Sequence, residues 1–351
     1  MNRLLRGITF FSTYVGLSII WQSAFAESRP VFNCVAGKSY IDTQVCRNAE
    51  FSKSNSELLS LYKSSLKKLS MEGRKSFQNS QQAWLKFVTT VCDRRNLPAQ
   101  LRDETAFCLA EKLDGRKRQL SKAIFNIGPY TIFRTDRYAA QRSSEEGDYS
   151  GHDTGYATLQ IGYPAMEGLD SPLKTEFNKT YVDFRNQGSR TGENDTDNWA
   201  DYQILKVSPR MLSIETQDGF YGHGAAHGEA GATMSRWLLK EQRQLRADDI
   251  FDPSKSWQII IQWLCFENIS KESGWDWDDE EEYGSGHLDS FMDYAAKSAL
   301  KPERWIFVNE GLKIRFMQYE VAAYAAGWPE VLIPWKDIQE FLADDARNKV
   351  R

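Results

Sequence analysis

The sequence lacks the motifs that mark the common hydrolase and nucleotide-binding classes. It contains no G-x-S-x-G sequence of a serine hydrolase and no glycine-rich phosphate-binding loop. Histidine is scarce, with four residues in the whole chain. Among the 48 acidic residues, no spacing singles out a carboxylate pair for glycoside chemistry. We therefore expect a non-catalytic protein without a cofactor, and an unrecognised hydrolase is the minor alternative.

Positive charge is not in surplus, since 44 Lys and Arg face 48 Asp and Glu, for a formal net charge of −4. Because phosphate backbones require a basic face, this balance argues against nucleic acid as a partner. A mildly acidic protein suits a basic protein partner, although many secreted proteins are acidic for solubility alone. The length of 351 residues favours two domains.

Long apolar runs are absent except near the N-terminus. There, Arg3 and Arg6 precede an apolar stretch at residues 8–21, and small residues follow up to Ala26. This order is typical of a secretory signal peptide at residues 1–26, cleaved after Ala26. The alternative is a membrane anchor, but the stretch is shorter than the roughly 20 residues that a spanning helix needs. Residue Glu27 is not a lipid-modified cysteine, so we expect a periplasmic or secreted protein without a membrane anchor.

Cysteine is also scarce, and four of the five cysteines lie in the first third of the chain. In an oxidising compartment, an even set in a small helical segment indicates a disulfide framework. Of the three possible pairings we favour Cys34–Cys46 and Cys92–Cys108, because each closes a short loop. The fifth, Cys265, lies in an apolar run and is expected to be a buried thiol rather than a nucleophile.

Residues 27–126 are predicted to form a small all-α domain. Ser54 and Glu57 have the spacing of a helix-capping box. Apolar residues then recur with helical spacing at residues 58–69 and 77–91, and again from Leu109 to Ile124. The second stripe contains Trp84, which we expect to pack in the core between helices.

This domain carries a family resemblance. The residues that define it are Phe32, Asn33, Cys34, Val45, Cys46, Leu58, Leu59, Leu61, Tyr62, Leu66, Leu69, Gln81, Gln82, Ala83, Trp84, Cys92 and Cys108. In this order and spacing they resemble the lysozyme inhibitor LprI-like domain. The resemblance implies a secreted helical module linked to lysozyme inhibition. Some members of that family are lipoproteins, and this chain departs from them because it has no lipidated cysteine.

Residues 127–155 are predicted to connect the two domains, with a first strand and a polar stretch at 143–151. That stretch is either a flexible boundary or a long hairpin loop. Residues 156–347 are expected to form an α+β domain with an antiparallel sheet, because helices are scattered among hairpin-connected strands. Strands are predicted at residues 157–161, 202–207, 211–216, 233–239, 305–308, 312–316 and 331–333, and helices at 173–184, 257–269, 291–300 and 335–342.

The second half resembles the domain shared by the anti-sigma factor RsiV and the non-catalytic part of some peptidoglycan deacetylases. The matching segments are residues 224–228, 245–251, 311–314 and 319–334. Ala323 stands where that pattern has proline, and residues 257–282 match it poorly. The corresponding domain of RsiV binds lysozyme, so the resemblance implies a lysozyme-binding domain. The catalytic domain of the deacetylases has no counterpart here.

His223 and His227 have the spacing of two metal ligands. A zinc site would need a helix to place both imidazoles on one face, and the glycines at 222, 224 and 228 argue against one. We therefore expect no metal and a structured glycine-rich turn, which could form the rim of a binding surface.

Two further segments are candidate binding sites. An acidic run with tryptophans is either a solvated loop or a docking patch for a basic partner, and it lacks the ligand pattern of a calcium loop. Its candidate residues are Trp275, Asp276, Trp277, Asp278, Asp279, Glu280, Glu281 and Glu282. Tyr319, Tyr324 and Trp328 lie in a loop before the last predicted strand, where they either pack in the core or form an exposed aromatic surface.

The sequence therefore predicts an extracytoplasmic binding protein rather than an enzyme. Its expected partner is lysozyme or another basic cell-wall hydrolase, which it would inhibit by blocking the cleft. The alternative is an envelope module that binds peptidoglycan or another glycan without inhibiting an enzyme.

Overall fold

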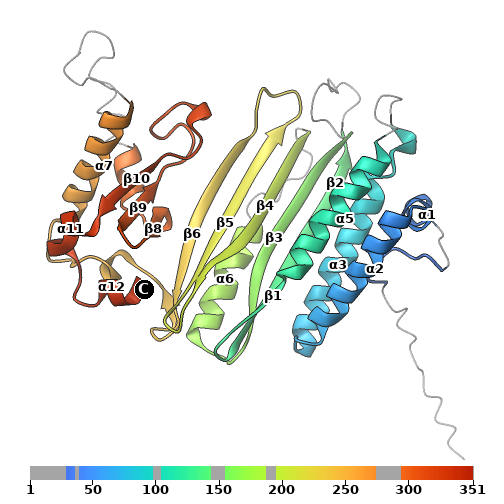
Figure 1. Ribbon diagram of the computed structural model, residues 1–351, viewed down its shortest axis with the longest axis horizontal. Coiled ribbons are helices and arrows are strands. Elements are labelled where there is room, and N and C mark those ends of the chain that lie inside the picture. Colours follow the sequence, from blue (N-terminus) through green and yellow to red (C-terminus); the bar gives the residue numbers. More distant parts are fainter. Residues whose placement is uncertain are drawn as a thin grey trace, which may run out of the picture.

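The computed structural model of the protein describes residues 29–35, 39–97, 104–143, 155–186, 195–273 and 294–350. A seven-stranded sheet forms the centre of the molecule, with a helical bundle beside one edge and a C-terminal unit beside the other (Figure 1). The predicted signal peptide and the acidic run at 275–282 lie outside the described residues. Within the described chain, no helix is both long enough and apolar enough to cross a membrane.

The helical bundle follows the N-terminal segment. It consists of α1 (Tyr40–Arg47), α2 (Ala49–Leu66), α3 (Met71–Val91), the 3-10 helix η1 (Arg94–Asn96) and α5 (Thr105–Ser121). Ser39, Asn48 and Ser70 cap the first three helices, because their side chains accept hydrogen bonds from first-turn N–H groups. The capping box predicted at Ser54 is wrong, since Asn48 starts α2 more than one turn earlier and Ser54 lies buried inside that helix.

Both predicted disulfides are confirmed. Cys34–Cys46 ties the N-terminal segment to α1, and Cys92–Cys108 ties the end of α3 to α5. The remaining cysteine, Cys265, is a buried free thiol, and burial raises its pKa well above the ordinary value.

Gln81 and Trp84, which form a Q-x-x-W sequence on α3, connect three parts of this bundle. Gln81 is buried, and its amide accepts a hydrogen bond from Arg116 Nε at 2.9 Å and donates one to the Pro30 carbonyl at 2.7 Å. Trp84 packs edge-on against the Phe32 ring, as expected for a core residue. The two motif residues therefore fix the N-terminal segment against α3 and α5.

The central sheet is mostly antiparallel, and its spatial order follows the chain. Its strands are β1 (Ile124–Ile127), β2 (Tyr130–Arg142), β3 (Tyr156–Gly168), β4 (Thr196–Val207), β5 (Met211–Gly222), β6 (Glu229–Leu238) and β7 (Arg243–Gln244). Strands β2 and β3 pair as an antiparallel hairpin over their whole length, and residues 144–154 between them lie outside the described residues. The sole parallel pair among the described strands is β3 with β4.

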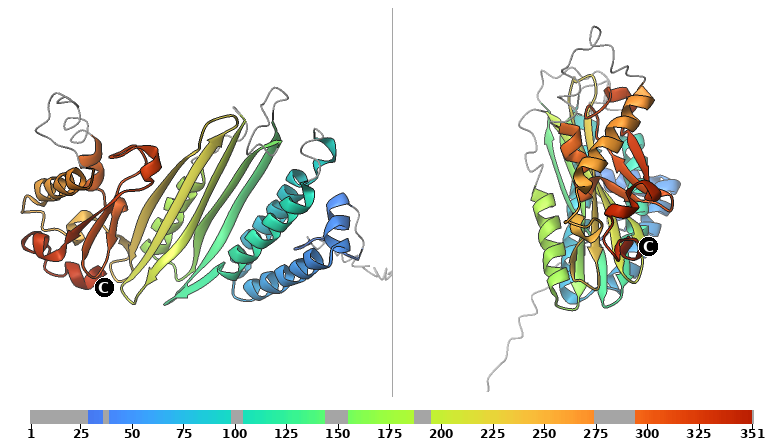
Figure 2. Two further views of the ribbon diagram at one scale, coloured as in Figure 1. Left: turned by 45° about the horizontal axis from the view of Figure 1, so that its top comes forward. Right: turned by 90° about the vertical axis from the view of Figure 1, so that its left-hand side faces the viewer.

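Helix α6 (Pro172–Asn186) connects the two parallel strands and lies on one face of the sheet (Figure 2). Its residues Leu173, Phe177 and Tyr181 are buried, and Trp237 of β6 packs against the last two rings. This is the amphipathic helix that the sequence predicts at 173–184. The bundle and the C-terminal unit lie instead beside the two edges of the sheet (Figure 1).

The C-terminal unit combines a small antiparallel sheet with helices. Its elements are η2 (Ala247–Asp249), α7 (Trp257–Ser273), α10 (Ala296–Ala299), η4 (Pro302–Arg304), β8 (Trp305–Phe307), β9 (Gly311–Arg315), η5 (Tyr324–Ala326), β10 (Glu330–Pro334), α11 (Trp335–Ile338), η6 (Gln339–Phe341) and α12 (Ala346–Val350). Its core is built on the rings of Phe251, Trp257 and Trp305. Arg236 of β6 joins this unit to the large sheet by donating to the carbonyl groups of Pro302 and Trp305.

Several predicted boundaries differ from the structure. Ile124 begins a strand rather than ending a helix, because α5 stops at Ser121 and the chain turns there. The helix predicted at 291–300 is described only as α10, since residues 291–293 lie outside the described chain. The helix predicted at 335–342 divides into α11 and η6, and α12 was not predicted.

Candidate functional site

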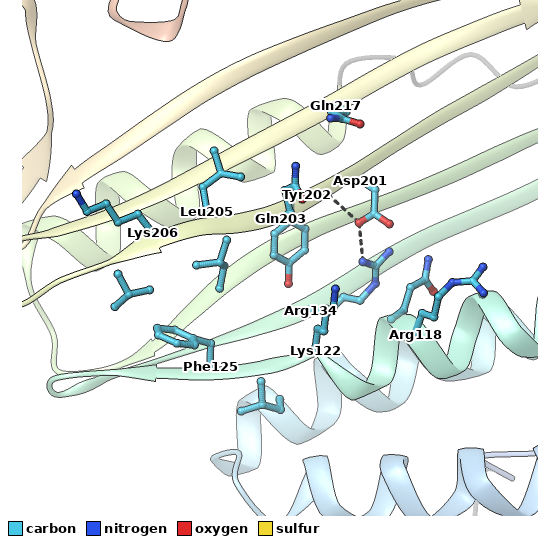
Figure 3. Close-up of a pocket in the computed structure, with 15 residues that line it drawn as sticks. Arg118, Lys122, Phe125, Arg134, Asp201, Tyr202, Gln203, Leu205, Lys206 and Gln217 are labelled. Carbon is cyan, nitrogen blue, oxygen red and sulfur yellow. Dashed lines mark hydrogen bonds and ion pairs between the residues drawn. The ribbon is translucent and has the colours of Figure 1, made fainter. Parts of the chain in front are cut away.

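A groove of about 780 Å³ lies between helix α5 and strand β4, and we call it the α5–β4 groove (Figure 3). It is lined by α5 and the residue after it, by the start of β1, by one side chain each of β2 and β5, and by the second half of β4. The lining residues are Gly115, Arg118, Gln119, Lys122, Ile124, Phe125, Arg134, Asp201, Tyr202, Gln203, Ile204, Leu205, Lys206, Val207 and Gln217.

The lining of the groove has a surplus of positive charge. Arg134 is neutralised, because it lies 2.6 Å from Asp201 and 2.6 Å from the buried Asp136. Arg118, Lys122 and Lys206 form no ion pair with any described residue. These three side chains therefore leave the groove cationic within a chain whose net charge is negative.

Strand β4 presents an open edge in this groove. Its ladder with β3 contains three residue pairs, which join residues 159–161 to residues 198–200. Beyond Ala200 the strand pairs only with β5 among the described strands. Leu205 and Val207 are accordingly exposed, at 45% and 39%. The sequence did not reveal this site, because each of its basic residues, considered alone, is an ordinary surface side chain.

A second surface gathers three of the predicted binding residues. His227 lies in the turn after β5, and Tyr319 and Tyr324 lie in the connection between β9 and β10. The His227 ring stacks on Tyr324 with centroids 3.9 Å apart, and its Nε2 lies 3.2 Å from the Tyr319 hydroxyl. Tyr319 is 59% exposed, so this aromatic cluster faces solvent rather than the core. We call these three residues the His227 cluster.

The remaining predicted residues have other places. His223 belongs to a different environment from His227, because its side chain is buried within 3.3 Å of Asp197 and 3.2 Å of Ser143 Oγ. It therefore anchors the turn to β2 and β4. Trp328 is half-buried beneath the guanidinium of Arg315, at 5.7 Å from the ring centroid. The acidic residues Asp276, Asp278, Asp279, Glu280, Glu281 and Glu282, with Trp275 and Trp277, lie outside the described chain.

The turn that carries both histidines is held by its own hydrogen bonds. Gly224 has a φ of +81°, which favours glycine, and the Ala225 N–H donates to the Gly222 carbonyl at 3.0 Å. The Tyr221 hydroxyl donates to the Ala225 carbonyl at 3.1 Å. In the described part of the chain no cluster of three or more His, Cys, Asp or Glu is arranged to hold a metal ion. The two histidines thus shape a turn and an aromatic surface.

Two segments of the chain match known protein families. Residues 34–123 match the family of the lysozyme inhibitor LprI, which covers α1 to α5 and both disulfides. Residues 248–336 match DUF3298, a family of proteins of unknown function, from η2 to α11. The first match confirms the N-terminal resemblance, and the second falls within the region predicted as the C-terminal extracytoplasmic domain.

No curated protein matches the chain. The solved structures that are similar in part include two of the DUF3298 family. A member of the DUF3298 family from Bacteroides fragilis is 15% identical, with a TM-score of 0.43, and the match covers 65% of this chain and 99% of that one. A DUF3298 family protein from Pseudomonas aeruginosa is 12% identical, with a TM-score of 0.39, and the match covers 62% and 97%.

Proposed function

We propose that this protein binds a lysozyme-type cell-wall hydrolase outside the cytoplasm and inhibits it by covering its substrate cleft. The observation that carries the proposal is the match of residues 34–123 to the lysozyme inhibitor LprI. The structure supports it, because this segment forms a bundle closed by two disulfides. Disulfides persist in oxidising compartments, which agrees with a periplasmic or secreted protein.

The three candidate surfaces differ in how well they suit a basic hydrolase. Arg118, Lys122 and Lys206 of the α5–β4 groove form no ion pair with a described residue and repel a basic hydrolase, so we place its contact elsewhere. The acidic residues at 276–282 suit a basic enzyme, since opposite charges raise the rate of association. The His227 cluster offers the exposed Tyr319 ring, and tyrosine is among the side chains that dominate binding energy in interfaces.

The test is titration of the signal-free protein with a basic animal-type lysozyme by calorimetry, together with a cell-wall lysis assay. We expect binding that weakens with salt, and loss of lysis in the same concentration range. A variant with amides in place of the acids at 276–282 should bind more slowly. Absence of binding at tens of micromolar, for lysozymes of every class, would contradict the proposal.

A second candidate function is binding of peptidoglycan without inhibition. The observation that favours it is the exposed His227 cluster, because stacked rings present flat apolar faces to sugar rings. Retention on insoluble peptidoglycan at high salt, combined with unchanged lysis, supports this candidate. Elution by salt alone points to charge instead and removes the support.

A further inference from the structure

We propose that the α5–β4 groove binds an extended acidic segment of a partner protein, which joins the sheet along the open edge of β4. This site is separate from the proposed hydrolase contact, because its charge has the wrong sign for a basic enzyme. The inference stands on three features of the groove, which are the strand edge, the charge and the apolar side chains.

The strand edge is the first feature. Residues 201–207 of β4 are seven consecutive residues that all line the groove, and β3 pairs with none of them. An unpaired edge offers backbone N–H and C=O groups to an extended chain, which is how strand addition recognises peptides. At the near end the Tyr202 N–H is covered by the Asp201 carboxylate at 2.7 Å. The open part of the edge therefore begins beyond Tyr202.

The charge is the second feature. Arg118 lies in the last turn of α5, and Lys122 is the residue that follows the helix. Both side chains are exposed. Lys206 lies across the groove on β4, where its Nζ donates to the Val350 carbonyl at 2.9 Å. Cations on both sides of the α5–β4 groove favour an anionic ligand between them. Carboxylates that project from an added strand would face these three side chains.

The apolar side chains are the third feature. Leu205, Val207 and Phe125 line the groove beside the cations, and the first two are more than a third exposed. Because successive side chains of a strand point to opposite faces of a sheet, a chain added beside β4 can present acids on the face of α5 and apolar groups on the other face. A glycan uses neither the backbone edge nor this alternation. The combination therefore favours an acidic peptide over a carbohydrate.

The test uses the full-length mature protein and a synthetic probe. The probe is a fluorescent, end-capped peptide of alternating glutamate and valine, with about eight residues to cover the open part of β4 at about 3.3 Å each. We expect saturable binding by fluorescence anisotropy. A peptide with lysine in place of glutamate should not bind, and one with proline at two valine positions should bind at least about tenfold more weakly, since proline removes N–H donors.

Matched variants locate the site. The double variant R118E/K122E should weaken binding at least about tenfold, since both charges are reversed. The control K67E/K68E carries the same charge change on exposed residues after α2 and should bind as the parent protein does. Equal weakening in both variants would overturn the proposal, because it would indicate general attraction only.

Hydrogen exchange tests the strand edge directly, and it does not depend on any substitution. Saturating probe should slow exchange of amides within residues 203–207 and leave those of α2 unchanged. Binding without this protection would overturn strand addition. Tighter binding of soluble peptidoglycan fragments than of the peptide, abolished by R118E/K122E, would assign the groove to a glycan instead. Calorimetry with lysozyme should be unchanged in that variant.

Discussion

Arg116 of α5 and Asp136 of β2 form a buried ion pair, with 2.8 Å between Nη1 and Oδ2 and no exposure of either side chain. The Asp136 N–H also donates to Ser80 of α3 at 2.9 Å, and its carboxylate binds Arg134. These contacts attach the helical bundle to the edge of the sheet. They also close that edge, which would otherwise offer unpaired backbone groups.

The first prediction concerns this joint. Replacing Asp136 by Asn leaves Arg116 and Arg134 buried without full compensation, which costs about 3–5 kcal/mol when one partner of a buried pair is removed. Urea unfolding should show this loss at pH 7. The matched control is Glu57→Gln, which breaks the exposed pair with Lys117 and should cost less than about 1 kcal/mol. Equal costs for the two changes would contradict the structural role of Asp136.

The second prediction concerns the disulfides of the bundle. Cys92–Cys108 joins residues 16 positions apart. Its removal by paired Cys→Ala substitution should lower the free energy of unfolding by about 3 kcal/mol, because the unfolded chain is then less constrained. Cys34–Cys46, with a separation of 12, should contribute slightly less. Thermal unfolding of the two double variants, with and without reductant, measures both. The parent protein with reductant should behave like the combined variant.

The third prediction is a pH dependence at Asp249. Burial raises the pKa of this carboxyl, but hydrogen bonds from Arg243, the Arg246 N–H and Lys349 outweigh burial and hold the pKa well below its ordinary value. A depressed folded pKa stabilises the protein above the unfolded pKa of about 3.9. That contribution is lost as the pH falls below about 4 towards the folded value.

The variant Asp249→Asn isolates this effect. It should be less stable than the parent protein at pH 7 by at least about 2 kcal/mol, and the difference should shrink between about pH 5 and pH 2. Urea midpoints at several pH values give the comparison. A difference that stays constant over this range would show that Asp249 acts through packing rather than through its charge.

Most of the elements were predictable because their burial has a regular period. Leu173, Phe177 and Tyr181 recur with helical spacing on α6, and all three are buried. The strand β4 extends further towards the N-terminus than predicted, to Thr196, because its first half pairs with β3 from a distant part of the chain. Local pattern carries no information about such pairing.

The candidate sites depend on contacts that a sequence does not state. The sequence singles out His227, Tyr319 and Tyr324 one by one. It does not show that they are in contact, because His227 and Tyr319 are 92 positions apart in the chain. The α5–β4 groove was missed altogether, because it exists only where the bundle, β1 and β4 converge. The one available signal was the basic character of α5, where Arg118 and Lys122 follow other cations.

The fourth prediction concerns Cys265. The thiol is fully buried, and its raised pKa disfavours the reactive thiolate. A thiol reagent should therefore leave the native protein unmodified at pH 8, and urea should expose one reactive thiol for each chain. Fast modification of the native protein at this residue, located by mass spectrometry, would show that α7 opens readily.

The fifth prediction concerns the His227 cluster. Tyr324→Ala removes the ring on which His227 stacks, and Tyr319 then loses its neighbour at 5.7 Å. Because the cluster is at the surface, the free energy of unfolding should change by less than about 1 kcal/mol, while affinity for the hydrolase should fall about tenfold.

The control Leu169→Ala shortens another exposed apolar side chain, at the turn after β3, and should change neither quantity. Calorimetry with lysozyme and urea unfolding decide the outcome. Unchanged affinity with Tyr324→Ala would remove the cluster from the interface and leave the helical bundle and the acidic residues at 276–282 as the contacts to map next.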